Sequence, residues 1–431
     1  MNAERNETDK ARGWLAISPI AVFIIVYLGA SLYVGDFYKM PISIAMLVAS
    51  IWAAVTIKGR TVSEKIEVFS KEAGKSNVMY MIWIFILAGV FAAIAKKIGA
   101  VEATVDVTLS FLPVQLIVPG LFVATCFISM AIGTSVGTVV AMTPFAVDMA
   151  SSIGSSVPFF VAIVLGGAFF GDNLSFISDT TIAATRTQGC DMKDKFMANI
   201  MIVLPAAMIS LVLYSIFSPH IDFVEVSNES SSYLVVPYLL VIILALIGIN
   251  VAIVLLAGIL VAVLAGLFIG MPILNIFYVA GEGVDSVGSL IVITLLAAGM
   301  LGMIKCAGGI DFILKLVGSG TSSKRGAQLS IVLLVGIVNL CTANNTVAII
   351  TVGSLAKKIA STYNIAEKKA ASLLDTGSCV VQALIPYGAQ TLMATSLAGI
   401  SPVEPLRYLF YPQVLVVCLA ISILVIRKRG Q

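Results

Sequence analysis

Two aspartates lie in a stretch that is otherwise almost free of charge. Asp172 and Asp179 are seven positions apart, so on a helix they would share a face, with Ser175 between them. An ionisable side chain among apolar neighbours is costly and is taken as functional by default. A carboxylate there can hold a cation when ionised and release it when protonated, which would let a metal ion and a proton exchange. The alternative is a helix cap, in which Asp172 or Asn173 binds backbone N–H groups at a helix break.

A second acidic cluster follows in the other half of the chain. Asp375 and Ser378 repeat the Asp-x-x-Ser of the first cluster at an offset of 203 positions. On this pairing Gln382 falls where the second aspartate of the first cluster sits, so a neutral amide replaces that carboxylate. A proline and a glycine at positions 386 and 388 predict a helix break with Gln390 beside it. The alternative is a kinked helix with a structural role only.

Two runs rich in Gly, Thr, Ser and Asn also match each other, 208 positions apart. Their polar side chains are Thr134, Ser135 and Thr138 in the first run and Asn344, Asn345 and Thr346 in the second. At the tip of a hairpin that enters a membrane without crossing it, such oxygen donors would suit a small alkali cation, and the adjoining helix N-termini would suit an anionic group. The alternative is close helix packing through small residues.

The elements that position these clusters are predicted to lie in a membrane. Hydrophobic residues make up 59% of the 431 residues and charged residues 11%, whereas a soluble domain carries about a quarter charged. Polar interruptions of the apolar pattern in the regions 104–185 and 310–400 are typical of re-entrant hairpins and broken helices. The sequence therefore predicts an all-α polytopic membrane protein with about 10–13 membrane segments. Apolar runs of spanning length lie at about 14–34, 40–57, 78–95, 196–217, 287–304 and 407–426, and a longer run at 233–269 predicts two helices or one long tilted helix.

Lysines and arginines predict the orientation of these segments. Basic residues at 58–75 and 427–429 place both termini in the cytoplasm, and the segment 220–232, which has acidic residues but no Lys or Arg, is read as external. Basic residues at 186–195 follow the first acidic cluster, whereas those at 357–369 precede the second. Because the cationic side swaps between the halves, two inverted-topology repeats are favoured over parallel ones.

The predicted organisation has five parts. They are a cytoplasmic tail at 1–13, N-terminal spans with a basic cytoplasmic linker at 14–77, the first repeat at 78–217, an external loop with connecting spans at 218–284, and the second repeat at 285–431. The six cysteines have no paired spacing, so neither a disulfide nor a metal cluster is expected. The single histidine, His220, lies in the external segment, so protonation has to fall on carboxylates or on a substrate. No nucleophile–base arrangement and no phosphate loop is recognisable, and neither an enzyme, a cofactor nor a nucleic-acid partner is expected.

The chain resembles the NhaC-type sodium/proton antiporter family, part of a larger ion-transporter superfamily. The resemblance rests on Gly171-Asp172-Asn173-Leu174-Ser175-x-x-Ser178-Asp179-Thr180-Thr181 and on Leu374-Asp375-Thr376-Gly377-Ser378 followed by Gly388-Ala389-Gln390. It implies sodium bound at hairpin tips beside substrate, and a homodimer whose transport domain moves against a fixed scaffold like an elevator. The chain departs from the family at Asn173, where Gly-Asp-Lys is usual. It also departs at 135–138, which lacks the amide of the Asn344-Asn345-Thr346 triplet.

The sequence and the resemblance together predict a sodium/proton antiporter of the plasma (inner) membrane, surrounded by lipid. We expect Asp172 and Asp375 to face each other near mid-membrane and to share Na+ and H+, so that one ion displaces the other. The predicted Na+ ligands are Asp172, Asp375, Asn344 and Thr346. The main alternative is a Na+- or H+-coupled exchanger of a small organic solute, an amino acid or a carboxylic acid, recognised in part by Gln382 and Gln390. A channel or sensor is disfavoured, because paired broken segments support alternating access better than an open pore.

Overall fold

The computed structural model describes residues 2–34, 41–100, 103–104, 107, 114–175, 178–218, 232–247, 249–318 and 323–424. These ranges are largely helical, and no strand occurs in them. His220 and the basic residues at 427–429, on which part of the predicted orientation depends, lie outside the described ranges.

The helices of the first half are α1 (Asn2–Val34), α2 (Ile42–Thr56), α3 (Val62–Ala73), α4 (Ser76–Lys97), η1 (Val114–Leu116), α6 (Ile117–Ile132), α7 (Ser135–Ser152), α8 (Val157–Leu174), α9 (Asp179–Gln188) and α10 (Met192–Ile216). Those of the second half are η2 (Ser232–Val235), α11 (Val236–Leu246), α12 (Val251–Phe268), α13 (Ile273–Ser286), α14 (Gly288–Cys306), α15 (Gly309–Gly318), α16 (Lys324–Thr342), α17 (Asn345–Thr362), α18 (Glu367–Leu384), α19 (Ala389–Ala398), η3 (Pro405–Tyr408) and α20 (Phe410–Leu424).

The apolar runs of the sequence fall on helices. Five helical stretches of the described ranges are long and apolar enough to cross a membrane, namely Val78–Lys97, Met192–Ile216, Val251–Phe268, Ile273–Cys306 and Lys324–Thr342. A sixth, Val157–Gln188, comprises α8 and α9 and includes positions 176 and 177, which lie outside the described ranges. The long run at 233–269 forms two helices, α11 and α12. The second of them starts at Asn250, whose side-chain oxygen accepts a hydrogen bond from the Ala252 N–H at 3.0 Å and so caps the helix.

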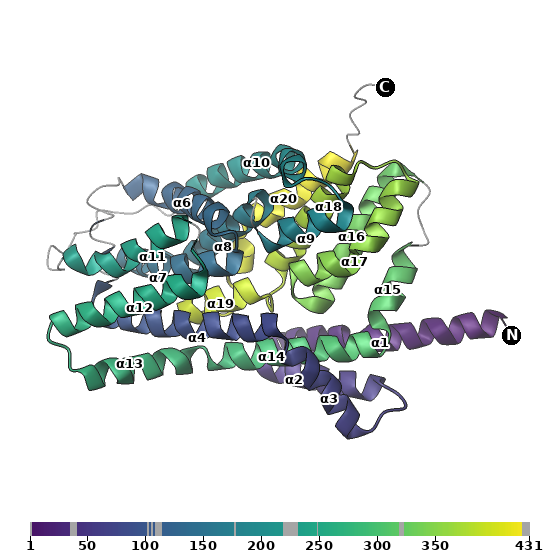
Figure 1. Ribbon diagram of the computed structural model, residues 1–431, viewed down its shortest axis with the longest axis horizontal. Coiled ribbons are helices and arrows are strands. Elements are labelled where there is room, and N and C mark those ends of the chain that lie inside the picture. Colours follow the sequence, from purple (N-terminus) through teal and green to yellow (C-terminus); the bar gives the residue numbers. More distant parts are fainter. Residues whose placement is uncertain are drawn as a thin grey trace.

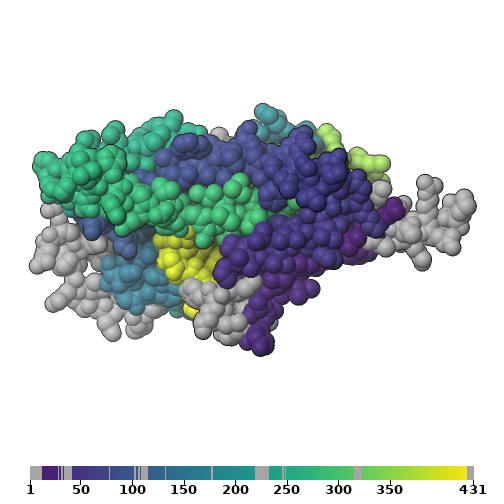
Figure 2. Space-filling view, turned by 90° about the horizontal axis from the view of Figure 1, so that it is seen from below, coloured from purple at the N-terminus to yellow at the C-terminus, as the bar shows by residue number. Residues whose placement is uncertain are grey.

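Two groups of helices lie side by side (Figure 1). We call α1–α4 with α12–α14 the edge layer, in which α2 packs on α1 and α14, and α4 packs on α12 and α13. We call α6–α10 with α16–α20 the core bundle. Figure 2 shows the outer face of the edge layer, with green residues of α12–α14 beside indigo and purple residues of the first helices. Large apolar side chains such as Leu256, Leu260 and Leu264 recur every four positions on the exposed side of α12, which is the surface that membrane lipid would cover.

The two helices that carry the acidic clusters lie deepest in the core bundle. Every residue of α8 from Phe159 to Leu174 is buried. Helix α6 comes very close to α8 because α8 has glycine at the contacts. A Cβ atom on Gly167 would lie 2.7 Å from the Cβ of Thr125, and one on Gly171 would overlap Ser129. Small residues are the usual means of bringing helix backbones together in membranes.

Two helical hairpins carry the predicted polar runs at their tips. Helix α6 ends at Gly133, which has φ 71°, and α7 begins two residues later. Helix α16 ends at Ala343, a non-glycine residue with φ 47°, and α17 again begins two residues later. We call Gly133–Thr134 the first tip and Ala343–Asn344 the second tip. The predicted interruptions beside the acidic clusters are also present, between α8 and α9 and between α18 and α19.

A constant offset relates the two halves of the core bundle. Left-handed residues recur 210 positions apart at Gly133 and Ala343, at Gly154 and Asn364, and at Gly189 and Gly399. Both limits of α7, α8 and α9 recur at the same offset in α17, α18 and α19, and the last residue of α6 recurs at that offset in α16. Packing is reciprocal as well, because α9 packs on α17 while α19 packs on α7. Side-chain bonds follow the same rule. The Ser129 hydroxyl donates to the Ala168 carbonyl at 2.7 Å, and in the second half the Asn339 amide donates to the Ser378 carbonyl at 2.7 Å.

This offset corrects one pairing taken from the sequence. Asp172 lies three residues from the end of α8, and the residue at that place in α18 is Gln382. Asp375 lies in the middle of α18, and its counterpart in α8 is Leu165. The Asp-x-x-Ser motifs that match at an offset of 203 are therefore two helical turns out of register, and Asp172 and Asp375 are not repeat partners.

Candidate functional site

A cavity of about 350 Å³ lies where the two hairpin tips meet. It brings together residues from both hairpins, both helix breaks and α4, so most of the polar residues singled out in the sequence converge on one space. The lining comprises Tyr80, Met81, Ile84, Gly133, Thr134, Ser135, Val136, Asp172, Asp179, Thr180, Ala343, Asn344, Asn345, Thr346, Val347, Ile350, Gln382, Ala389 and Gln390.

Asp172 joins the end of α8 to the start of α7. Its side chain is 5% exposed, and one carboxylate oxygen accepts the backbone N–H of Ser135 at 3.1 Å. The other oxygen accepts the Ser135 hydroxyl. Ser135 is the first residue of α7, so this carboxylate occupies the positive end of that helix. The helix-cap alternative for Asp172 is thus realised across two helices, in a residue that also faces the cavity.

A chain of hydrogen bonds links the two tips through glutamine side chains. The Gln382 amide donates to the Ala343 carbonyl at 3.1 Å and to the Gln390 oxygen at 2.8 Å. Gln390 in turn donates to the Ser135 hydroxyl at 2.9 Å, and that hydroxyl donates to Asp172. The environment of the carboxylate is therefore coupled through these bonds to the backbone of the second tip.

At the second tip, polar side chains hold the start of α17. The Asn344 oxygen accepts the Val347 N–H at 3.0 Å, and the Asn345 oxygen accepts the Thr346 N–H at 3.1 Å. The Thr342 hydroxyl donates to the Asn344 carbonyl at 3.0 Å. The amide oxygen of Asn344 thus serves as a helix cap, and Asn344, Asn345 and Thr346 all line the cavity.

Several other predicted site residues serve the surrounding structure. Asp179 is exposed at the cavity, in the first turn of α9. Thr138 donates to the carbonyl of Thr134 at 3.0 Å, and Ser175 donates to the carbonyl of Met130 at 3.0 Å. The Ser378 hydroxyl donates to the Asp375 carbonyl in its own helix, at 2.9 Å. Among these residues, only Asp179 and Thr134 line the cavity.

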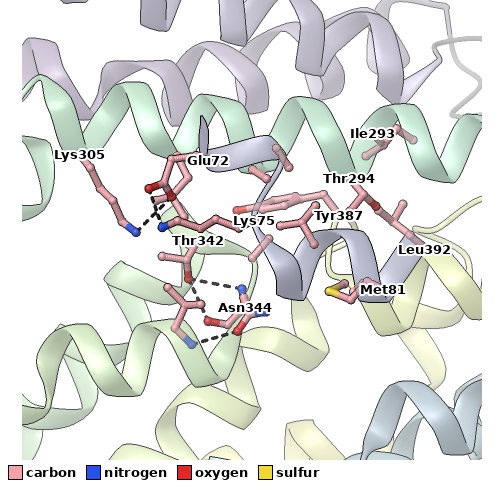
Figure 3. A pocket seen from close by; sticks show the side chains of 17 residues that line it. Glu72, Lys75, Met81, Ile293, Thr294, Lys305, Thr342, Asn344, Tyr387 and Leu392 are labelled. Carbon is pink, nitrogen blue, oxygen red and sulfur yellow. Dashed lines mark hydrogen bonds and ion pairs between the residues drawn. The ribbon is translucent and has the colours of Figure 1, made fainter. Parts of the chain in front are cut away.

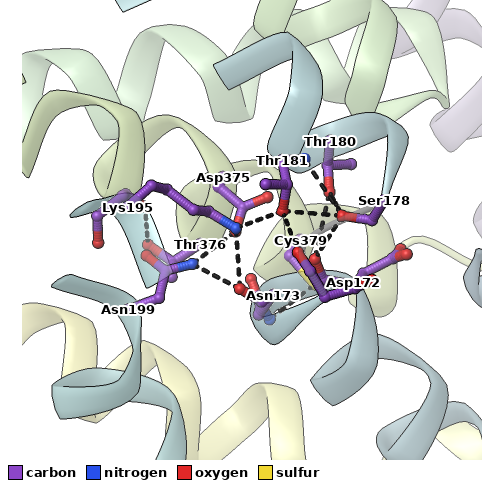
Figure 4. A network of polar contacts seen from close by, with 12 residues as sticks. Asp172, Asn173, Ser178, Thr180, Thr181, Lys195, Asn199, Asp375, Thr376 and Cys379 are labelled. Carbon is purple, nitrogen blue, oxygen red and sulfur yellow. Dashed lines mark hydrogen bonds and ion pairs between the residues drawn. The ribbon is translucent and has the colours of Figure 1, made fainter. Parts of the chain in front are cut away.

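Asp375 lies in a separate buried network, shown in Figure 4. Lys195 of α10 is 1% exposed, and its ammonium lies 2.8 Å from the Asp375 carboxylate. The same ammonium donates to the Asn173 carbonyl at 2.9 Å and to the Thr181 hydroxyl at 2.7 Å. Asn199, one turn along α10, also donates to the Asn173 carbonyl and to the Asp375 carboxylate, at 2.8 and 2.7 Å. The ion pair and the hydrogen bonds of Lys195 therefore connect α8, α9, α10 and α18 next to the residue that follows Asp172.

This network corrects the expectation that both aspartates face one cavity. Asp375 does not line the cavity, because it faces Lys195 instead. Lys195 thus places a buried cation beside the acidic motifs. Asn173, where Gly-Asp-Lys is usual in the family that the sequence resembles, also turns away from the cavity: its amide donates to the Tyr411 hydroxyl at 3.0 Å.

A smaller pocket of about 80 Å³ lies on the other side of the second tip (Figure 3). Glu72 sits between two lysines there, 2.6 Å from the Lys75 ammonium and 3.6 Å from the Lys305 ammonium. Lys305, at the end of α14, thus pairs with the end of α3 within the edge layer. Ala343 and Asn344 line both this pocket and the larger cavity.

Comparison with known proteins identifies relatives along nearly the whole chain. A family model described as "Na+/H+ antiporter family" matches residues 2–218 and 223–427. The Na(+)/H(+) antiporter NhaC of Bacillus subtilis is 25% identical over 374 residues, which cover 78% of this chain and 82% of that protein. The malate-2H(+)/Na(+)-lactate antiporter of the same organism is 21% identical over 427 residues, covering 91% of each chain. Among solved structures, the Alcanivorax borkumensis YdaH transporter overlays with a TM-score of 0.43 at 12% identity, over 83% of this chain and 86% of that one.

Proposed function

The chain belongs to the Na+/H+ antiporter family, and from this premise we propose that it exchanges Na+ for protons at Asp172. Family membership makes it an integral membrane transporter rather than an enzyme. The proposal adds the site, the ion-exchanging group and the way in which the two sides of the membrane gain access in turn.

The observation that carries the proposal is the position of Asp172. Its carboxylate lines the cavity at the meeting point of both tips and is bonded to the start of α7. Other hard oxygen donors line the same cavity, including the hydroxyls of Ser135 and Thr346, and such donors suit an alkali cation. A proton on the carboxylate removes the charge that holds Na+, and bound Na+ excludes the proton. Competition for one group then enforces exchange without any further device.

Asp375 has a different role in this proposal. Its charge is balanced by Lys195, and both side chains are 1% exposed. We propose that the pair stabilises the break between α8 and α9. The Lys195 ammonium also donates to the Asn173 carbonyl on one side of that break and to the Thr181 hydroxyl on the other. Na+ is then held by Asp172 with donors from the tips, and Asp375 contributes no ligand.

Alternating access would follow from movement of the core bundle against the edge layer. The reciprocal packing of α9 on α17 and α19 on α7 supports a two-fold relation between the halves. Together with the swap of basic residues between 186–195 and 357–369, it favours inverted repeats. The proposal includes a homodimer of the plasma membrane with both termini in the cytoplasm, in line with the resemblance noted in the sequence.

A second candidate function, exchange of a small organic solute, is supported by the size of the cavity and by one relative. The malate-2H(+)/Na(+)-lactate antiporter matches 91% of this chain, so a relative of this chain is named for the exchange of organic anions together with Na+ and H+. The cavity of about 350 Å³ is also larger than an ion alone requires.

The test is ion exchange by the purified protein in vesicles that contain a pH-sensitive dye. Addition of Na+ outside should change the internal pH, and Asp172→Asn should abolish the response because an amide cannot release a proton. Asp191→Asn is the matched control, since Asp191 is exposed at the start of α10. Full pH-dependent exchange in the Asp172→Asn protein would remove Asp172 from the role.

A further inference from the structure

The main cavity is large enough for a solute with several heavy atoms. Its volume of about 350 Å³ falls within the range of small-molecule sites, roughly 300–1,000 Å³. The walls combine polar groups from the two tips with apolar side chains, among them Met81, Ile84 and Ile350. A site for Na+ and protons alone has no need for these apolar walls.

The two hairpins differ at the positive ends of their second helices. At the first tip the start of α7 is occupied by the carboxylate of Asp172, which accepts the Ser135 N–H at 3.1 Å. At the second tip the residue in the same place is Gln382, 210 positions later. Its neutral amide donates to the Ala343 carbonyl and to Gln390. The start of α17 therefore faces the cavity with no side-chain carboxylate in the place that Asp172 fills at the first tip.

An unpaired donor marks the same place. Asn345, the first residue of α17, lines the cavity and is 6% exposed. Its side-chain oxygen accepts the Thr346 N–H, but its amide nitrogen has no hydrogen-bond partner in the described part of the chain. A buried donor without a partner is unfavourable, and an anionic group from a ligand would supply the missing acceptor. The positive end of a helix adds to the attraction.

Negative charge also lies on the wall of the cavity. Asp172, near the end of α8, is bonded to the start of α7 beside the first tip, and Asp179 lies at the start of α9, which packs on α17. These are the two acidic side chains among the described lining residues. No lysine or arginine is found among those residues. The cavity thus presents a carboxylate-binding corner at one tip and a cation-binding corner at the other.

We propose that this cavity binds an α-amino acid. Its carboxylate lies at the start of α17 beside the amide nitrogen of Asn345, its ammonium group pairs with Asp172, and its side chain contacts the apolar wall. The inference rests on the proposed function, because the ammonium occupies the carboxylate at which Na+ and the proton are exchanged. Amino acid, Na+ and proton then exclude one another at Asp172, which couples movement of the amino acid to the ion gradients.

Ligand competition on the wild-type protein tests this directly. Each of the standard amino acids is added to vesicles that exchange Na+ for protons, and the Na+ concentration for half-maximal exchange is measured. At least one amino acid should raise that concentration. Analogues that lack one charged group should need about tenfold or more higher concentrations, because each loses a charge-assisted contact. For L-leucine these analogues are 4-methylpentanoate and isopentylamine.

A substitution tests the carboxylate corner by itself. Asn345→Asp places a like charge beside the ligand carboxylate and should weaken amino-acid binding about tenfold or more, measured by thermal stabilisation of the purified protein. Asn364→Asp is the matched control, because Asn364 is an exposed left-handed residue and aspartate tolerates that conformation.

The outcomes separate this inference from the proposed function. Na+/H+ exchange that no amino acid affects would overturn the inference and leave the proposed function in place. Equal potency of the amine or the acid alone would also overturn it, as would unchanged amino-acid binding in the Asn345→Asp protein. Absence of any Na+/H+ exchange in the wild-type protein would instead remove the proposed function.

Discussion

Replacement of Lys195 by methionine should destabilise the protein strongly. Methionine keeps much of the side-chain volume but removes the ammonium that lies 2.8 Å from Asp375. The carboxylate is 1% exposed and would keep Asn199 as its hydrogen-bond donor, at 2.7 Å. Removing one partner of a buried ion pair costs about 3–5 kcal/mol, because the remaining charge is left in a low-dielectric environment.

The double variant Lys195→Met/Asp375→Leu should recover most of that loss. It leaves no charge unpaired, and replacing a buried pair by apolar residues is often neutral. Two further bonds of the ammonium disappear, but the Asn173 carbonyl keeps the Asn199 amide at 2.8 Å as a donor. The Thr181 hydroxyl likewise keeps its own bond to the Ser175 carbonyl, also at 2.8 Å. The remaining cost should be about 1–2 kcal/mol.

The assay is unfolding of the purified proteins in detergent, followed by intrinsic fluorescence with heat and with denaturant. The expected order of stability is wild type, then the double variant, then Lys195→Met. A Lys195→Met protein as stable as the wild type would refute the buried pair. A double variant less stable than the single one would show that Asp375 stabilises the protein through contacts other than its pair with Lys195, such as its bond to Asn199.

Two further substitutions follow from the structure. Gly171→Ala should destabilise the protein by about 1–3 kcal/mol, because the added methyl group would overlap Ser129 where α6 contacts α8. Gly120→Ala is the control, since a methyl group there meets open space. Thermal unfolding compares the two variants, and equal stability would contradict the close contact. Gln390→Leu removes the donor to the Ser135 hydroxyl and should raise the Na+ concentration for half-maximal exchange about tenfold. An unchanged concentration would show that the hydrogen-bond chain between the tips does not affect Na+ binding at Asp172.

The sequence predicted those features that depend on composition and local breaks. The apolar pattern placed the spans, and Gly, Asn and Pro marked where helices end. The long run 233–269 forms two helices, one of the two predicted alternatives, and Asn250 caps the second of them. The polar runs lie at the tips of two helical hairpins, and both tips line one cavity. Helix ends and apolar spans depend on residues close together in the chain, so a single sequence is enough to predict them.

The register of the repeat and the buried cation could not be obtained in the same way. A shift of seven residues is two helical turns, so Asp375 and Gln382 share a face of α18, and periodicity alone does not choose between them as the partner of Asp172. Lys195 was interpreted as a marker of membrane orientation, since lysines flank spans. A signal was present nonetheless: Lys195, Asn199 and Ser210 lie on one side of α10, and that side is buried. Polar residues that recur at helical spacing within a span indicate an interior face.

The most direct test of Asp172 as the shared group is proton release on Na+ binding. The purified protein is placed in weakly buffered detergent solution with a pH indicator, and NaCl is added against a choline chloride control. The wild type should release a proton as Na+ binds, and the Asp172→Asn protein should bind Na+ weakly and release none. Equal proton release from both proteins would contradict the assignment, since the exchanged proton would then come from another group.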